Sequence, residues 1–292
     1  MAKYDNIEFS AMKIAKYWAK TSIEAKFPNK PSFPICCWGA SNVSVAQARE
    51  NALARARNVL NHLVKPKNIL DRYLYSDRML REEIIREYPD SAGNIAYAIT
   101  RNSYGALVLN TSKVLFADID LKPEGAWTSI KRMLGFVRQS QEEAVLKKIR
   151  EWSDAQPARD LRIYRTFNGY RLLLTDSLFD PTSLETQQVL ESLESDKLYL
   201  KLCRAQESFR ARLSPKPWRI DMKNPPCRFP YEESEKHLKH HDWLKKYEIC
   251  SNDYAICRLV AVSGNKNVHP EVKPIIQLHD RYCQVDIDRP LA

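Results

Sequence analysis

The segment from Val114 to Leu213 alternates strand-like and helical stretches, and this order constrains the fold more than any other feature of the sequence. Val114 to Leu121 is an apolar run with the composition of a buried strand. Pro123 then opens a long amphipathic stretch that continues to Trp152 and ends before Pro157, as expected for a helix.

A hairpin and a second helix complete this segment. Leu161 to Phe167 and Tyr170 to Thr175 are separated by Asn168-Gly169, which readily supplies the positive φ angles of a two-residue turn. Asp180 to Leu202 predicts a helix, and Phe209 to Leu213 a last strand. The resulting β-α-β-β-α-β order predicts an α+β protein whose core is an RRM/ferredoxin-like antiparallel sheet, with both helices on one face and the other face free for ligands.

The N-terminal region, residues 1–93, is predicted to be helical. Ser44 and Gln47 have the spacing of a capping box before a helix from Val45 to Leu63, and a second helix is expected from Asp77 to Tyr88. Its arginines could line a phosphate-binding side or an ordinary solvated face; they are Arg49, Arg55 and Arg57.

The RRM-like core is assigned to residues 94–222, because strands at Ile95 to Thr100 and Ala106 to Asn110 lead into it as an antiparallel meander. Residues 223–292 are predicted to be a C-terminal extension packed on the core. It should contain a charged helix from Glu232 to Tyr247, an apolar segment around Tyr254 to Val262 and a strand near Val272 to Leu278.

The charge balance favours polyanionic partners, because 46 Lys and Arg face 36 Asp and Glu, a net charge of +10. The sequence has no secretory signal and no stretch of eighteen apolar residues, so a cytoplasmic protein without membrane partners is expected. Its seven Cys include no CxxC pair and fit reduced thiols.

Two aspartates stand at the end of the first core strand. Strand alternation puts Phe116, Asp118 and Asp120 on one face, while Ala117 and Ile119 face the helices. Two neighbouring carboxylates repel each other unless a positive charge lies between them, and oxygen ligands suit Mg²⁺ or Mn²⁺. The alternative is that Asp120 caps the helix near Pro123 while Asp118 pairs with an arginine.

This Asp-x-Asp strand resembles motif I of the archaeo-eukaryotic primases, including the polymerase domain of bacterial end-joining ligases. The stretch Phe116 to Lys122 is also similar to the metal strand of diguanylate cyclases, although the cyclase Gly-Gly-Asp-Glu-Phe turn is missing. Both families are palm-type nucleotidyl transferases with an RRM-like core. The resemblance covers about residues 114–213 and implies Asp118 and Asp120 as catalytic metal ligands.

The primase resemblance also implies a phosphate-binding position on the hairpin. Arg171 stands where primases have a histidine, and Arg can hold phosphate through its fork of donors. Arg165 and Lys122 are further phosphate-binding candidates. A third carboxylate is expected on or after the last core strand, and Asp221 is the candidate there.

A basic segment with interleaved aromatics follows, as in proteins that hold a nucleic-acid strand by its phosphates and bases. The nucleic-acid-binding candidates are Arg204, Arg210, Arg212, Lys216, Trp218 and Arg219. The alternative is a solvated edge strand protected by charge.

The leading hypothesis is therefore a nucleic-acid-associated, Mg²⁺- or Mn²⁺-dependent nucleotidyl transferase of the primase/polymerase type. The alternatives are a relative that binds nucleic acid or nucleotide without turnover, and a metal-dependent nuclease using Pro89-Asp90 with Asp120-Leu121-Lys122. A zinc site from His237, His240 and His241 with Cys250 and Cys257 matches no standard spacing, and incidental histidines on a charged helix explain those residues better.

Overall fold

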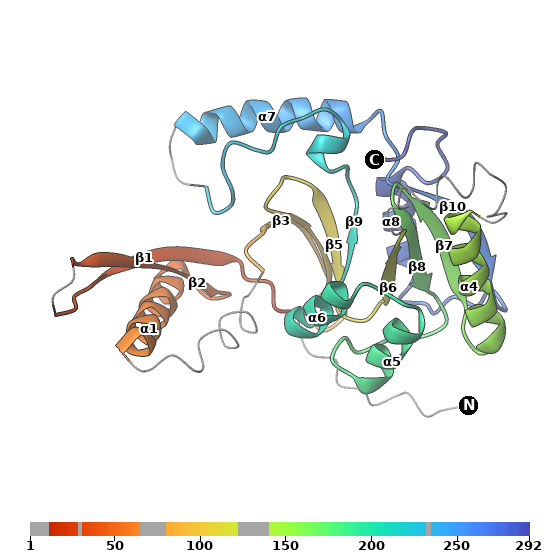
Figure 1. The fold of residues 1–292 in the computed structure, drawn as a ribbon, viewed down its shortest axis with the longest axis horizontal. Coiled ribbons are helices and arrows are strands. Elements are labelled where there is room, and N and C mark those ends of the chain that lie inside the picture. The colour runs from red at the N-terminus through yellow and green to blue at the C-terminus, as the bar shows by residue number, and fades with distance from the viewer. Residues whose placement is uncertain (1–11, 29–30, 65–79, 122–139, 232–234) are drawn as a thin grey trace, which may run out of the picture.

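The computed structural model describes residues 12–28, 31–64, 80–121, 140–231 and 235–292. Its strands form three antiparallel sheets, of which two four-stranded ones lie side by side in the body of the molecule (Figure 1). The protein is thus α+β, as the sequence predicts. Among the described helices, none has the length and apolar character needed to span a membrane.

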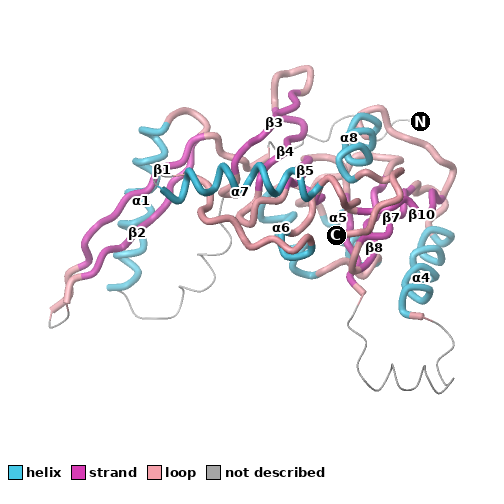
Figure 2. The backbone as a smooth tube through the Cα atoms, turned by 90° about the horizontal axis from the view of Figure 1, so that it is seen from above, coloured by secondary structure: helices cyan, strands magenta, loops and turns pink. Residues whose placement is uncertain are grey.

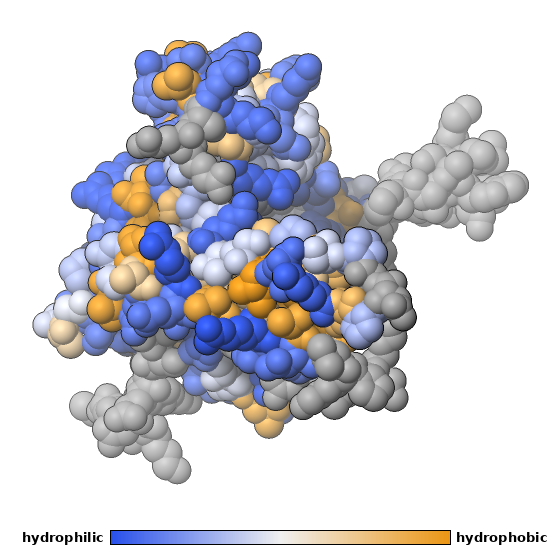
Figure 3. All heavy atoms as spheres, turned by 90° about the vertical axis from the view of Figure 1, so that its left-hand side faces the viewer, coloured by the Kyte–Doolittle hydropathy of each residue, from blue (hydrophilic) through white to orange (hydrophobic). Residues whose placement is uncertain are grey.

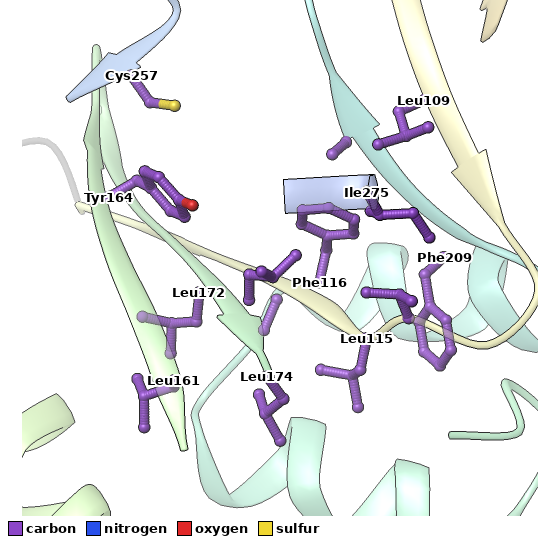
Figure 4. Close-up of a cluster of buried hydrophobic side chains, with 14 of the residues drawn as sticks. Leu109, Leu115, Phe116, Leu161, Tyr164, Leu172, Leu174, Phe209, Cys257 and Ile275 are labelled. Carbon is purple, nitrogen blue, oxygen red and sulfur yellow. The ribbon is translucent and has the colours of Figure 1, made fainter. Parts of the chain in front are cut away.

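The central sheet has the strand order β10-β7-β8-β6. These strands are β6 (Phe116–Asp120), β7 (Leu161–Thr166), β8 (Gly169–Leu174) and β10 (Cys257–Ser263). Every residue of β8 is buried, which accounts for its apolar Leu172 to Leu174, and the strand also buries the charged Arg171. Side chains from these strands fill the main core, part of which is shown in Figure 4.

The second sheet has the order β3-β4-β5-β9. It consists of β3 (Glu83–Pro89), β4 (Ile95–Arg101), β5 (Leu107–Thr111) and β9 (Phe209–Arg212). The prediction of one sheet containing all four core strands is therefore wrong for β9, which pairs with β5. The predicted meander is also split between the two sheets, since β4 and β5 lie in the second sheet and β6 lies in the central one. At the turn between β5 and β6, the Thr111 hydroxyl donates to the Val114 carbonyl and accepts from the Val114 amide, both at 2.9 Å.

Both faces of the central sheet are covered by helices, so the prediction of one face free for ligands is wrong. On the Ile119 face, α4 (Gln141–Ala155) and α5 (Leu184–Ser192) lie next to each other, joined by a 2.8 Å hydrogen bond from Trp152 Nε1 to Ser192 Oγ. On the opposite face, α8 (Lys273–Cys283) packs its His279 ring 5.4 Å from the ring of Phe116.

The predicted strand near Val272 to Leu278 is thus wrong, because this segment is the start of α8. Pro274 lies in its first turn, and buried Ile275, Leu278 and His279 recur at helical spacing. Since β10 and α8 contribute to the main core, residues 223–292 are more than a peripheral extension.

The prediction that residues 1–93 are helical is wrong in part, because their described portion also contains strands. A hairpin of β1 (Tyr17–Ala25) and β2 (Phe33–Ser41) packs against α1 (Val45–Val64). The predicted helix after Ser44 is confirmed, with the Gln47 amide donating to the Ser44 hydroxyl at 3.1 Å. Gly39 is required where helix and hairpin meet, since a Cβ there would lie 2.1 Å from the Ala48 carbonyl oxygen.

This hairpin and helix project from one end of the body in both ribbon views (Figures 1 and 2), and Figure 3 shows the molecule from that end, with apolar side chains gathered among hydrophilic ones. The predicted helix from Asp77 to Tyr88 is wrong over its described part, which is strand β3. Pairing of β3 with β4 and its β-branched Ile84-Ile85 favour the strand.

The predicted helix from Asp180 to Leu202 is two helices, α5 and α6 (Lys197–Gln206), because Glu194 has a φ of 54°. The hairpin between β7 and β8 is confirmed, but its turn residues are Phe167 and Asn168, and neither Asn168 nor Gly169 has a positive φ. After β9 come the short 3-10 helix η1 (Pro217–Arg219) and α7 (Glu235–Ser251), which lies above the second sheet in Figure 1.

Candidate functional site: an acidic pair in a basic pocket

The two aspartates of β6 leave the sheet at its open end. In the pairing register Asp118 lies opposite Arg171, and Asp120 lies opposite Gly169. Gly169 lets the strands approach, because a Cβ there would lie 2.0 Å from the Ile119 carbonyl oxygen. Asp120 is exposed, and the Asp118 side chain is 38% exposed, so both carboxylates can be reached from solvent.

Arg171 holds Asp118 from within the core. Its Nε donates to Asp118 Oδ1 at 2.9 Å, its Nη2 to Oδ2 at 3.4 Å, and its Nη1 to the Arg212 carbonyl at 2.8 Å. Burial lowers the pKa of Arg171, but the Asp118 carboxylate outweighs this and the net shift is upward. The expected alternative of an Asp118–Arg pair is therefore present, yet the exposed part of the carboxylate can still bind a cation.

The aspartates and the basic segment face the same pocket, which has a volume of about 380 Å³. Its charged lining residues are Glu82, Asp118, Asp120, Arg171, Asp196, Arg210, Arg212, Lys216 and Arg219. These residues come from β6, β8, β9 and η1 and from positions just before β3, α6 and η1, so the pocket lies where the central and second sheets meet.

The positive charges of the pocket are only partly neutralised by its carboxylates. Burial, followed by repulsion from Arg171, lowers the pKa of Arg212. Burial and the neighbouring arginines also lower the pKa of Lys216 and of Arg219. Arg212 Nη1 is buried without a hydrogen-bond partner. An anionic ligand would satisfy this donor and relieve the repulsion among the cations.

The carboxylates of the pocket repel one another, as its cations do. Burial raises the pKa of Asp120, and so do the charges of Asp118 and Asp196, while Lys216 and Arg219 oppose this rise. Asp196 caps α6 by accepting from the Leu198 amide at 3.0 Å. Asp118, Asp120 and Asp196 therefore face the same pocket, but they do not form a group whose oxygens all lie within 4.8 Å of one another. Asp118 and Asp120 are the candidate cation ligands, and Asp196 adds negative charge near them.

Exposed aromatic rings border the pocket beside its cations. Trp218 is 53% exposed, with its ring centroid 5.3 Å from that of Tyr104 and 5.6 Å from Lys216 Nζ. The guanidinium of Arg219 lies 4.3 Å from the centroid of Phe167, which is 47% exposed. These rings leave faces on which planar groups could stack.

Not every candidate from the sequence lines this pocket. Asp221, which follows η1 with a φ of 54°, is absent from the lining. Exposed Arg204 and Trp218 are absent as well. So is half-buried Arg165, which bonds Glu142 and the hairpin carbonyls of Thr166 and Gly169. Arg210 lines it, but its Nη2 is paired with both oxygens of Glu82 at 2.7 Å.

Two further candidates depend on segments away from the pocket or outside the described residues. Lys122 and the helix start at Pro123 lie outside them. Asp90, of the nuclease-like pattern, accepts from the amides of Ala92 and Asn94 at 2.9 Å in the turn between β3 and β4, away from the pocket lining. The structure thus separates the two halves of that pattern.

The histidines of α7 belong to an aromatic stack instead of a ligand cluster. The rings of His237 and His240 lie 5.2 and 4.7 Å from Tyr231, and His240 also stacks on Trp243. Burial and nearby positive charge lower the pKa of His240. The sequence favoured incidental histidines on a charged surface helix, but His240 is buried within this stack.

Sequence reasoning missed Asp196, although its place before a helical stretch was visible as an N-cap signal. It also missed Tyr104, since nothing in the sequence brings this β4-β5 connection to the basic segment. A scan against protein-family models and searches of curated proteins and of solved structures found no match to this chain.

Proposed function

We propose that this protein is a divalent-metal-dependent nucleotidyl transferase acting with nucleic acid. The observation that carries the proposal is that Asp118 and Asp120 share one pocket with Arg212, Lys216 and Arg219. A metal-bound triphosphate has the matching pattern, because its ion needs carboxylate oxygens and its remaining negative charge needs cations.

Mg²⁺ or Mn²⁺ would be held by Asp118 and Asp120, whose oxygen donors suit these ions. When bound, such ions activate an attacking hydroxyl and neutralise charge on the phosphates. Asp196 is our candidate for the third carboxylate, since it lines the pocket and its negative charge raises the pKa of Asp120.

The arginines divide into two roles under this proposal. All three donor nitrogens of Arg171 are directed at Asp118 or at the Arg212 carbonyl, so we assign it the positioning of Asp118. Arg212 has an unpartnered Nη1 and becomes the phosphate ligand in its place. This assignment moves the phosphate contact from β8 to β9.

A nucleic-acid strand is proposed to run along the exposed rings of Trp218 and Phe167 beside the pocket, which we call the aromatic rim. Trp218 and Phe167 offer exposed rings, and Lys216 and Arg219 lie over them. Stacked bases with phosphates on neighbouring cations are the usual combination for single strands. The β7-β8-β6 order matches three of the four strands of an RRM-like core, whereas β9, the expected fourth strand, pairs in the second sheet. This order is compatible with a primase-like core and does not select that class over other proteins with such a sheet.

The test is incorporation of labelled nucleotides on single-stranded and primed DNA and RNA, with Mg²⁺ or Mn²⁺. Asp120→Asn should abolish incorporation, and it is preferable to a change at Asp118, which also neutralises Arg171. Asp253→Asn, an exposed aspartate outside the pocket, is the matched control.

Comparing Asp196→Asn with Asp221→Asn tests the third carboxylate, and Asn at position 196 can still cap α6. We expect the larger loss from Asp196→Asn. Strand binding without incorporation would favour the non-catalytic alternative, and metal-dependent shortening of the labelled strand would favour a nuclease. Absence of both metal and nucleotide binding would reject the proposal.

A further inference from the structure

Behind the floor of the pocket, two cysteines and a histidine converge from β10 and α8. Cys257, His279 and Cys283 are completely buried, and their potential ligand atoms all lie within 4.8 Å of one another. His279 and Cys283 are four residues apart on one helix, so they share a face. Within the described residues, no other group of three or more His, Cys, Asp or Glu side chains converges in this way.

The surroundings of His279 favour a lone pair on its inward nitrogen, Nε2, which lies 3.4 Å from the donor Arg171 Nη1. Its Nδ1 lies 2.9 Å from Asp280 Oδ1, and Asp280 also accepts from the Tyr164 hydroxyl at 2.8 Å and from Arg162 Nη2 at 2.6 Å. A proton on Nδ1 therefore leaves the Nε2 lone pair on the side of Cys257, 3.9 Å away. A carboxylate behind a histidine is the arrangement that orients metal-binding imidazoles.

From these contacts we infer that Cys257, His279 and Cys283 form a structural zinc site. Thiolate and imidazole are the donors that zinc prefers, at about 2.3 Å for sulfur and about 2.0–2.1 Å for nitrogen. Such bonds put tetrahedral ligand atoms about 3.5–3.8 Å apart, so the present 3.9 Å between Cys257 Sγ and His279 Nε2 needs little adjustment. Figure 4 shows the Cys257 sulfur directed into the core beside Tyr164.

The charge balance suits this buried position. Zinc with two thiolates and a neutral imidazole has no net charge, and binding releases the two thiol protons to solvent. This neutrality matters because Arg171 Nη1 lies 3.4 Å from His279 Nε2, and its own charge is already balanced by Asp118. A fourth ligand can be water or a backbone oxygen, and the Arg212 carbonyl lies 3.7 Å from Cys283 Sγ.

The alternative is that these are ordinary core thiols beside a core histidine. Cys203 provides that comparison within the chain, since it is equally buried but has no second cysteine or histidine in such a cluster. The zinc site would join β10 and α8 directly behind Arg171. Its existence is independent of nucleotidyl transfer, so either proposal can fail alone.

The experiment is metal analysis of the full chain, purified through a tag without His or Cys after expression with added zinc. We expect about one zinc per chain, and this zinc should remain bound after dialysis of the protein against dilute chelator. Cys257→Ser and Cys283→Ser each remove a direct ligand and should weaken zinc binding by more than the roughly tenfold loss typical of an outer-shell partner, whereas Cys203→Ser should retain zinc. Zinc-free wild type, or equal loss from Cys203→Ser, would overturn the inference.

A second measurement covers the case in which the cysteine variants do not fold. Replacing zinc by Co²⁺ in the wild-type chain should produce the d–d bands of a tetrahedral ion and a thiolate-to-cobalt charge-transfer band. Mapping by alkylation and mass spectrometry should show Cys257 and Cys283 protected until a strong chelator is added. A Cys257–Cys283 disulfide in the freshly purified protein, or a purely octahedral cobalt spectrum, would contradict the site.

Discussion

Arg171 separates two regions with opposite chemistry. On one side, Asp118 and Asp120 line a pocket open to solvent, together with cations that the protein leaves partly uncompensated. On the other, Cys257 and His279 lie completely buried in the core, with one carboxylate behind the imidazole. Hard oxygen donors near water suit an exchangeable Mg²⁺ or Mn²⁺, whereas buried sulfur and nitrogen suit a permanent zinc.

The largest expected effect is on stability, and it comes from removing the Asp118 carboxylate, which pairs with Arg171 between the two regions. Asp118→Ala should lower the free energy of unfolding by about 3 kcal/mol, because it leaves the buried Arg171 guanidinium without its counter-charge. Urea denaturation measures this difference. Asp120→Asn is the matched control and should be neutral or slightly stabilising, since it removes repulsion with Asp118 and Asp196. Equal effects of the two changes would contradict the assignment of Asp118, and not Asp120, as the counter-charge of Arg171.

Adding zinc and adding Mg²⁺ should stabilise the protein through different regions. Free zinc at about a hundredfold above its Kd should raise the free energy of unfolding by about 2.7 kcal/mol in the wild type and leave Cys283→Ser unchanged. Mg²⁺ should bind the zinc-loaded protein through Asp120 regardless of Cys283. Thermal unfolding with each ion, in both variants, measures the effect. A zinc effect that Asp120→Asn abolishes would place the ion in the pocket instead of the core.

The aromatic rim should contribute to strand binding alone. Trp218→Ala should weaken single-stranded DNA or RNA binding by about 1 kcal/mol, at the lower end of base stacking, because its ring already contacts Tyr104. Fluorescence anisotropy with labelled oligonucleotides measures this. Phe33→Ala, another exposed aromatic on β2, serves as the control and should change little. Unchanged affinity in the Trp218 variant would exclude the rim from the strand path.

The smallest effect is expected in the salt dependence of binding. Changing Lys216 and Arg219 together to Gln should reduce the log-log salt slope by about 1.4, the value for two phosphate contacts with a single strand. Arg212 is kept, because its buried guanidinium belongs to the packing as well as to the pocket. An unaltered slope would mean that these two cations form a solvated face, as the sequence also allowed.

Local patterns were enough to predict individual elements. The periodicity and cap at Ser44 predicted α1, and the apolar runs on either side of Asn168-Gly169 predicted the β7-β8 hairpin. Failures occurred where pairing decided between helix and strand. Glu83 to Tyr88 became a strand through its partner β4, and the segment after Val272 became a helix through burial of one face against the central sheet.

The sequence by itself determined the acidic pair, because alternation along an apolar strand directs Asp118 and Asp120 to one face whatever lies opposite. It also determined the basic segment as a set of neighbours in the chain. Tertiary structure alone decided that β9 joins the second sheet and thereby carries Arg212 and, beyond it, Lys216 and Arg219 to those aspartates. It likewise brought Cys257 to His279 and Cys283, because contacts between distant segments depend on strand pairing and helix packing, which local periodicity does not encode.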